Sequence, residues 1–280
     1  MLLVPSDVLN PRRVDEHFAA EADAARAAGR CVGLVDHDAL AADDADRAVT
    51  RLAGDEGLAV YRGWMLTATA YAGFAVALAA RGITLRTSAE QYRRAHELPG
   101  WYPALAAFTP ASAWTVGAGR DGFDKASATL GAGPAVVRDY VKSMKHYWHE
   151  ATYIPELADA DAAWAVARRL HELRGDDFTG GFVLRRFEEF TGAEARTWWV
   201  NGTFRMATAH PDSPDQAPPA DLPVAALEDP VGALDLPFVT VDLARRSDGV
   251  WRVIELGDGQ VSDRPTTTPA GTLLHVLEPH

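Results

Sequence analysis

The stretch FVTVDLARRSDGVWRVIEL, residues 238–256, decides the fold assignment of this 280-residue chain. Two apolar, strand-like segments flank Asp248-Gly249, a dipeptide that favours a two-residue hairpin turn. With that turn, Asp242 on one strand faces Glu255 on the other. Opposed side chains point to one face of the sheet about 5 Å apart, where like charges repel. The sequence therefore predicts two carboxylates held close together on one hairpin.

Four arrangements are compatible with such a carboxylate pair. One carboxyl is protonated, a cation lies between the two, the hairpin has another register, or both acids are solvated on an edge hairpin. Because Thr240, Ala244 and Val253 make the predicted face mostly apolar, a hard divalent cation such as Mg2+ fits better than solvated acids. The bend that follows, residues 257–260 with the sequence GDGQ, supplies further oxygen ligands, Asp258 among them.

A basic cluster lies upstream in VVRDYVKSMKHYW, residues 136–148. Arg138 ends an apolar strand-like run, and Lys142 and Lys145 follow it, whereas Lys125 is the one other lysine in the sequence. Three cations in one loop of an acidic protein indicate a site for phosphate. The alternative is a solvated loop in which the lysines gather by chance.

Two further strand-like segments lie between the basic cluster and the hairpin. GGFVLRRFEEF, residues 180–190, runs into Glu188 and Glu189, as is needed where a backbone segment lines an adenine and an acid reaches a ribose hydroxyl. An ordinary strand end gives the same pattern. EARTWWV, residues 194–200, places Arg196 on a strand, where its charge can meet a terminal phosphate.

The N-terminal part predicts an α/β layer. Short apolar runs at residues 2–4, 32–35 and 58–61 are typical of buried parallel strands, and a helix that ends at Gly29 separates the first two. The 17 mostly apolar residues 64–80 are short for a membrane span and favour a buried helix. Helical sequence continues to residue 103, and residues 110–133 are expected to form a linker or an inter-domain helix.

The second half predicts strands and two hairpins. Strands are expected at residues 135–137 and 182–184, with an amphipathic helix over 161–174 between them. Asn201-Gly202 predicts a two-residue turn between strands, and the proline-rich residues 210–223 predict a surface excursion.

Composition limits the class of partner and the compartment. The net charge of -12 argues against general binding to nucleic acid or to anionic membranes, so no such partner is expected. Cys31 is the single cysteine, so no internal disulfide is possible, and residues 1–7 lack the pattern of a secretion signal. We therefore predict a cytoplasmic protein.

In their order along the chain, VVRDYVKSMKHYW, GGFVLRRFEEF, EARTWWVNG and VIELGDGQVS resemble the ATP-grasp superfamily, in a compact branch with a lysine-rich phosphate loop and a Gly-Asp-Gly-Gln ending. The resemblance implies an α/β N-terminal domain over residues 1–115 and an α+β ATP-grasp domain over 116–280. Two subdomains of that fold clasp the nucleotide, and the cofactors are ATP and Mg2+.

The resemblance also implies roles for individual residues. Nucleotide contacts fall to Arg138, Lys142, Lys145, Arg186, Glu188, Glu189 and Arg196. Arg196 and Lys142 are the implied catalytic residues, and the implied metal ligands are Asp242, Glu255 and Asp258. Two departures from the family pattern are visible: Asp258 stands one place later than in the usual Glu-x-Asn ending, and the phosphate loop lacks a glycine run.

The implied activity is that of an ATP-dependent ligase. Such an enzyme joins a carboxylate to an amine or a related nucleophile through an acyl phosphate and releases ADP and phosphate. The substrates would be small-molecule or peptide carboxylates and amines, and Arg62, Trp64, Trp101 and Tyr102 either line the acceptor pocket or pack at the domain junction. The alternatives are a kinase-like phosphotransferase and a nucleotide-binding regulatory module without turnover.

Overall fold

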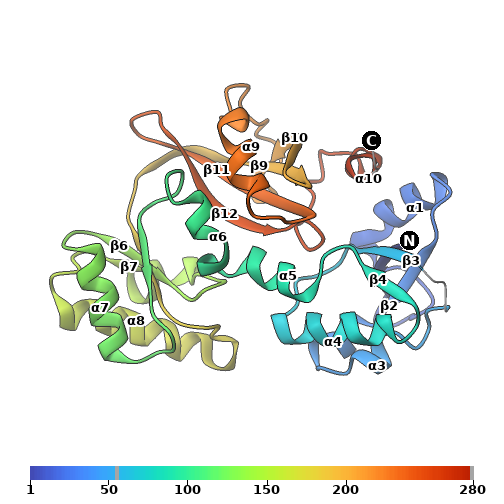
Figure 1. Cartoon of the computed structure of the whole chain (residues 1–280), viewed down its shortest axis with the longest axis horizontal. Coiled ribbons are helices and arrows are strands. Elements are labelled where there is room, and N and C mark those ends of the chain that lie inside the picture. The colour runs from blue at the N-terminus through green and yellow to red at the C-terminus, as the bar shows by residue number, and fades with distance from the viewer. Residues whose placement is uncertain (54–56, 278–280) are drawn as a thin grey trace. The chain divides into compact units, whose positions relative to one another are not determined.

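The computed structural model describes residues 1–53 and 57–277 (Figure 1). Its strands form three four-stranded sheets within that part of the chain. Two compact units are present. Unit 1 comprises Met1–Ala95, Ala193–Leu243 and Glu255–His280, and unit 2 comprises His96–Gly192 and Ala244–Ile254. The domain boundary predicted after residue 115 therefore falls inside unit 2.

The N-terminal sheet of unit 1 is parallel and has the strand order β2-β1-β3-β4. Its strands are β1 (Leu2–Pro5), β2 (Val32–Val35), β3 (Gly57–Tyr61) and β4 (Ile83–Leu85). The segment η1 (Glu16–Phe18) and helix α1 (Ala19–Ala27) connect β1 to β2, which confirms the predicted strand, helix and strand. The chain then crosses β1 to place β3 on its other side, so the direction of winding reverses at β1.

Four helices accompany this sheet, of which α4 is strongly apolar. They are α2 (His37–Ala41), α3 (Ala45–Ala48), α4 (Ala68–Ala79) and α5 (Ala89–His96). The hydroxyl of Thr67 caps α4 by accepting the N–H of Ala70, and the helix buries Tyr71, Phe74 and Leu78 in the core. This confirms a buried helix within residues 64–80. Across the described ranges, every helix is too short or too polar to cross a bilayer.

The second sheet has the order β10-β9-β11-β12. Its strands are β9 (Phe190–Val200), β10 (Thr203–Ala209), β11 (Phe238–Arg246) and β12 (Trp251–Asp258). Val200 pairs with Thr203 around the Asn201-Gly202 turn, and both turn residues have positive φ, which confirms the first hairpin. Helix α9 (Val224–Gly232) follows the irregular, proline-rich stretch, and α10 (Ala270–Val276) packs against α1.

The second hairpin differs from the sequence-based prediction. The Arg246 N–H donates to the Val250 carbonyl at 2.8 Å, so the turn has three residues and ends at Gly249, with φ +89°. The two-residue turn would place Ser247 opposite Val250. Ser247 instead donates its N–H to the backbone carbonyl of Glu189. Asp-Gly suits both turn types, and here the Asp248 carboxylate binds the Arg246 guanidinium and the Val250 N–H, which stabilises the longer turn.

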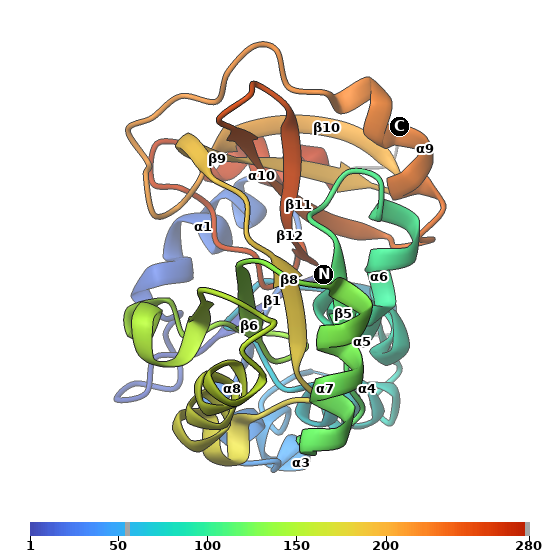
Figure 2. The same cartoon turned by 90° about the vertical axis from the view of Figure 1, so that its left-hand side faces the viewer.

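The third sheet belongs to unit 2 and has the order β5-β8-β6-β7, with antiparallel neighbours. Its strands are β5 (Ser112–Trp114), β6 (Ala135–Arg138), β7 (Tyr153–Ile154) and β8 (Val183–Arg186). Helices α7 (Arg120–Leu130) and α8 (Ala160–Arg174) lie side by side against this sheet and share its core (Figure 2). Residues 110–133 were expected to form a linker or an inter-domain helix; they contain a helix, α7, but it lies within unit 2 together with β5, so the linker alternative is wrong.

Four further helical segments complete unit 2. They are α6 (Leu98–Leu105), η2 (Lys145–Tyr147), η3 (Trp148–Thr152) and η4 (Gly175–Asp177). The predicted strands at 135–137 and 182–184 and the helix over 161–174 are confirmed within a residue or two.

Candidate functional site

A buried ion pair joins two of the predicted site residues. Arg196 on β9 donates from Nε and Nη2 to the two carboxylate oxygens of Asp242 on β11, each at 2.8 Å. The Asp242 side chain is 4% exposed, and the Arg196 side chain 12%. Burial alone raises the pKa of Asp242, but the charge and hydrogen bonds of Arg196 outweigh it and hold the pKa at about 2. Asp242 is therefore ionised at neutral pH.

Two residues that the sequence did not point to complete this cluster. Glu194 lies two positions before Arg196 on β9, and His210 follows β10, whose residue Thr208 pairs with Arg196. His210 Nε2 lies 3.5 Å from Asp242 Oδ2 and 3.8 Å from Glu194 Oε2. Within the described ranges, ligand atoms of Glu194, His210 and Asp242 come within 4.8 Å of one another. Glu194 was detectable by its i,i+2 spacing from Arg196, whereas the chain pairing that brings in His210 leaves no local signal.

Glu255, the other acid of the predicted pair, lies half-buried on β12. Burial lowers the pKa of Arg196, but the charges of Asp242 and then of Glu255 raise it above its ordinary value. Glu255 is thus within electrostatic range of the guanidinium. Of the four arrangements, the one with a different hairpin turn is observed, and the cation paired with Asp242 is a side chain of the protein itself.

The donor set of this cluster fits Mg2+. Each Asp242 oxygen accepts one N–H from Arg196, and a carboxylate has about four lone-pair directions in total, so further coordination is open to it. Asp242 and Glu255 supply the one or two carboxylates that Mg2+ takes from a protein when phosphates complete its shell. These two residues would hold the metal.

Asp258, the third predicted ligand, has different surroundings. It is 1% exposed, and its Oδ1 accepts the Gln260 N–H at 2.8 Å. Burial raises its pKa to about 6. The Gln260 amide is also engaged, because it accepts the Tyr61 N–H and donates to the Tyr71 hydroxyl.

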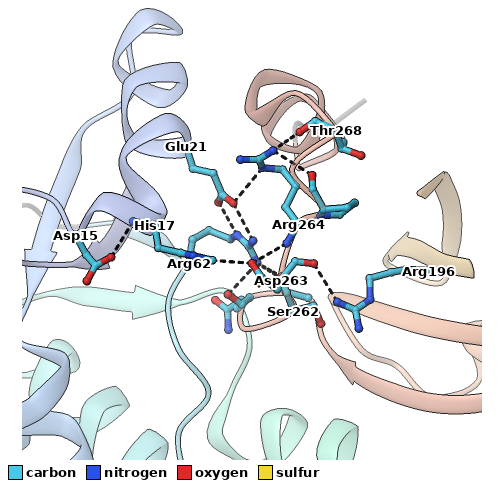
Figure 3. Close-up of polar contacts among 12 residues, drawn as sticks. Asp15, His17, Glu21, Arg62, Arg196, Ser262, Asp263, Arg264 and Thr268 are labelled. Carbon is cyan, nitrogen blue, oxygen red and sulfur yellow. Dashed lines mark hydrogen bonds and ion pairs between the residues drawn. The ribbon is translucent and has the colours of Figure 1, made fainter. Parts of the chain in front are cut away.

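Arg62 fixes the segment that carries these residues. Its guanidinium donates to both Glu21 oxygens and to the backbone carbonyls of Gly259, Gln260 and Ser262, and Figure 3 shows it between α1 and the chain after β12. Arg196 in turn donates Nη1 to the Asp263 carbonyl at 3.0 Å (Figure 3). Arg62 therefore holds the end of the GDGQ bend and the residues after it, and Asp263 of that segment contacts Arg196.

The predicted phosphate loop lies in unit 2 and is organised by Asp139. This fully buried carboxylate accepts the N–H groups of Val141 and Lys142 on Oδ1 and the Arg174 guanidinium on Oδ2. The role of Asp139 was missed, although an Asp two and three residues before the accepted N–H groups is the signal of such a turn. These hydrogen bonds fix the backbone of the loop, whereas the Lys142 and Lys145 side chains remain exposed.

The cations of this loop fall into two kinds. Arg138 is buried at the end of β6 and donates to the Val141 carbonyl, so it takes part in holding the loop. Lys142 and Lys145 are exposed, and their ammonium groups make neither a hydrogen bond nor an ion pair with any described residue. Both lysines are free to contact an anion.

Two of the three residues predicted to contact the nucleotide from the segment 180–190 form hydrogen bonds within unit 2. Arg186 donates to backbone carbonyls between Leu130 and Pro134. Glu188 forms a bidentate pair with Arg252, with both N–O distances 2.9 Å. The Glu189 side chain is exposed.

Arg62, Trp64, Trp101 and Tyr102 were predicted either to line an acceptor pocket or to pack at the domain junction. The structure gives them different surroundings. Trp64 is 40% exposed and lines a cavity of unit 1. Arg62 and Trp101 are almost fully buried, and the Tyr102 hydroxyl accepts the Ser112 N–H within unit 2. Trp64 therefore fits the pocket interpretation, whereas the other three have structural partners.

Comparison with solved structures shows the same fold over nearly the whole chain. D-cycloserine synthetase DcsG is 21% identical with a TM-score of 0.68, and the match covers 99% of this chain and 98% of that one. A RimK domain ATP-grasp protein from Sphaerobacter thermophilus DSM 20745 is 17% identical with a TM-score of 0.62, at 99% coverage of both chains. The ATP-grasp ligase PsnB, in a complex with minimal precursor, Mg and ADP, is 13% identical with a TM-score of 0.55, at 99% and 96% coverage.

Comparison at the level of sequence identifies the family. A search of curated proteins finds no match. A family model described as ATP-grasp domain, R-2-K clade family 3, matches residues 129–277, more than half of the chain. The superfamily and fold class predicted from the four motifs are thereby confirmed. The chain belongs to the R-2-K clade of ATP-grasp domains.

Proposed function

We propose that this protein is an ATP-dependent, ADP-forming ligase that activates a carboxylate as an acyl phosphate and transfers the acyl group to an amine or a related nucleophile. The observation that carries the proposal is the buried, ionised Asp242 paired with Arg196 and accompanied by Glu255, in a chain of the ATP-grasp family. The solved relatives described as a synthetase and as a ligase support the reaction class, and the precursor bound to PsnB supports peptide as well as small-molecule substrates.

Different residues would bind the metal and the phosphates. Asp242 and Glu255 would hold Mg2+, which when bound supplies charge neutralisation for the nucleotide phosphates. Arg196 is held by Asp242 and by the Asp263 carbonyl, so its guanidinium has a fixed direction and is suited to stabilise the transferred phosphoryl group. Lys142 and Lys145 remain free to contact the nucleotide phosphates.

Hydroxylamine trapping tests the proposal without knowledge of the natural amine. The full-length protein is incubated with MgATP, hydroxylamine and a panel of carboxylic acids, and ADP and hydroxamate are measured together. We expect at least one acid to give both products in equal amounts. ADP with a stable phosphorylated product that hydroxylamine leaves intact would favour a phosphotransferase instead, and nucleotide binding without ADP across the panel would favour a regulatory module.

A pair of matched variants tests the role of Asp242. Both Asp242 and Asp248 form bidentate pairs with an arginine, but Asp248 lies exposed on the hairpin turn. We expect Asp242→Asn to lower hydroxamate formation by about a hundredfold or more, since a charge contact to the reacting centre is lost, and Asp248→Asn to leave it unchanged. Because Asp242→Asn leaves Arg196 without its buried partner, Glu255→Gln is tested beside it, with thermal unfolding measured for all three. Wild-type turnover in both Asp242→Asn and Glu255→Gln would contradict the metal assignment.

A further inference from the structure

A cavity of about 140 Å3 opens at the carboxyl ends of β1 and β2 in unit 1. The segments that follow β1 and β2 form its wall, and Trp64, which follows β3, closes one side. This is the place where the winding of the sheet reverses, because β2 and β3 lie on opposite sides of β1. Ligands of open α/β sheets bind outside the carboxyl ends of strands at such a reversal.

The Ser6 hydroxyl points to a missing partner in this cavity. Ser6 lines the cavity and is 8% exposed. Its backbone N–H donates to Val35, whereas its hydroxyl makes no hydrogen bond to any residue that the structure describes. The hydroxyl is nevertheless not among the fully enclosed polar atoms without a partner, so it faces the accessible space of the cavity. A hydroxyl that is accessible and has no protein partner is open to hydrogen-bond with a molecule seated in the cavity.

Carboxylates oriented by the backbone line the same cavity as this hydroxyl. One oxygen of Asp7 accepts the N–H groups of Leu9 and Asn10. One oxygen of Asp15 accepts the His17 N–H, and one oxygen of Asp36 accepts the Ala39 N–H. Each of these three carboxylates therefore has a fixed direction, and its second oxygen accepts no hydrogen bond from a described residue, although that of Asp36 forms an ion pair with Arg47. Preorganised oxygens of this kind bind a cation without first losing side-chain freedom.

The charge of the cavity wall is strongly negative. Asp38 adds a fourth carboxylate. Among the described residues that line the cavity, Arg47 is the one arginine or lysine, and its Nη2 lies 3.8 Å from Asp36 Oδ2. Burial lowers the pKa of His37, although the charges of Asp38, Asp15 and Asp36 raise it, so the imidazole is neutral at physiological pH. The wall thus has four negative charges and one positive charge.

Contacts within unit 1 connect the cavity to Arg196. The Trp64 ring lies 4.4 Å from the His17 ring, centroid to centroid. His17 Nε2 lies 2.8 Å from the Asp263 carboxylate, and the Asp263 carbonyl accepts the Arg196 Nη1 (Figure 3). Trp64, His17 and Asp263 therefore lie in series between the cavity and the proposed phosphoryl-transfer residue.

We propose that this cavity binds the cationic head group, a primary ammonium or a guanidinium, of the substrate that the ligase joins. The inference rests on the proposed function and names the substrate class. Four carboxylates keep such a head group protonated and thus unreactive, so it serves for recognition, and a second group on the same molecule reacts near Arg196. A cavity of about 150 Å3 holds a molecule the size of benzene, so a head group with about six non-hydrogen atoms fits.

Calorimetric titration of the full-length protein with butane-1,4-diamine tests the proposal in the absence of nucleotide. Butane-1,4-diol and butanedioate are the neutral and anionic controls of the same length. We expect the diamine to bind and the two controls to show no measurable binding. Equal binding of diamine and diol would overturn the proposal, as would the absence of diamine binding.

Variants locate the binding. Asn caps a helix as well as Asp, so the double variant Asp15→Asn/Asp36→Asn removes two charges and preserves both backbone contacts. We expect it to weaken diamine binding by about tenfold or more, and Ser6→Ala by a smaller factor. Asp23→Asn, which removes an exposed carboxylate on α1 outside the cavity, is the matched control and should bind as the wild type does. Equal weakening by Asp23→Asn would show a diffuse charge effect and contradict the site.

The two proposals fail in different ways. If the diamine binds as expected but no acid yields a hydroxamate, the ligase function is wrong and the cation site stands. If a hydroxamate forms but the cavity variants bind the diamine as the wild type does, the cation site is wrong and the ligase function stands.

Discussion

Asp258 shows how the surroundings of one carboxyl can separate a structural role from a catalytic one. Its Oδ2 and the Thr87 hydroxyl are both buried, and neither has a hydrogen-bond partner of good geometry among the described residues. The Tyr71 and Tyr92 rings stack on each other, and burial raises the pKa of both phenols, which the negative charge of Asp258 raises further. An ionised Asp258 is therefore poorly compensated, in contrast to Asp242, which Arg196 neutralises.

The pH dependence of stability follows from this difference. The pKa of Asp258 is about 6 in the folded state against an ordinary 3.8, so folding favours the protonated form. Its contribution to the free energy of unfolding is complete below about pH 4 and is lost as the pH rises through about 6, on the order of 3 kcal/mol in total. We expect Asp258→Asn to abolish this loss and to stabilise the protein at pH 8 more than at pH 4. Urea unfolding at both values measures it, and an unchanged pH profile would contradict the assignment.

Residue types and spacing predicted part of the candidate site. Arg196 and Asp242 were both identified from the sequence, and the structure brings them together. Their direct pairing was not predicted, because it depends on β9 lying next to β11, which local sequence does not encode. For the same reason Asp242 was expected to be repelled by Glu255, whereas it has a buried partner.

The two hairpins show what turn chemistry can and cannot specify. Asn201-Gly202 has positive φ at both positions, as the predicted turn requires, and it formed where expected. Asp248-Gly249 has the same signal but forms a three-residue turn, because the Asp248 side chain binds Arg246 and Val250. A single dipeptide predicts where a hairpin turn occurs. Neighbouring side chains decide the length of the turn and therefore the register of the two strands.

Gly202 allows a sharp test at the level of the hairpin. Its φ is +76°, and a Cβ added there would lie 2.6 Å from Gly232 Cα on α9. We expect Gly202→Ala to lower the free energy of unfolding by about 2 kcal/mol or more, through backbone strain and collision with the helix. Gly249→Ala is the matched control, because its φ is +89° but no described atom lies within 4 Å of an added Cβ, so about 1 kcal/mol of strain is expected. Equal losses in urea unfolding would contradict the contact with α9.

At the scale of the whole molecule, unit 1 is assembled from three separate stretches of sequence. Sequence patterns predicted several strands of each of the first two stretches, but not α9 or α10, and composition gave no sign that residues 193–243 and 255–280 fold with the N-terminal sheet. Arg62 and Glu21 explain part of this arrangement, because a buried guanidinium requires partners and finds three of them at residues 259–262. A lone arginine in the sequence does not indicate which distant carbonyls it will meet.

Replacement of Arg62 tests this long-range connection. Arg62 and Glu21 have side chains 1% and 4% exposed, so Arg62→Ala leaves a buried carboxylate and several carbonyls unpaired. We expect a loss of roughly 3 to 5 kcal/mol in the free energy of unfolding. Arg26→Ala, which removes the exposed pair with Asp23 on the same helix, should change it by no more than about 0.5 kcal/mol. Hydrogen exchange of residues 259–277 should accelerate in Arg62→Ala and not in Arg26→Ala, and unchanged exchange would contradict the role of Arg62.

The same contacts set an order of events during synthesis. The carbonyls that satisfy Arg62 lie about 200 residues after it, so they leave the ribosome long after the N-terminal sheet has been synthesised. Until then Glu21 is the charged partner of Arg62 within the N-terminal segment. Arg264, which also pairs with Glu21 in the folded protein, has not yet been synthesised. A premature stop before residue 259 would therefore leave the buried Arg62 guanidinium without its carbonyl partners, and such fragments are expected to be substrates for chaperones and proteases.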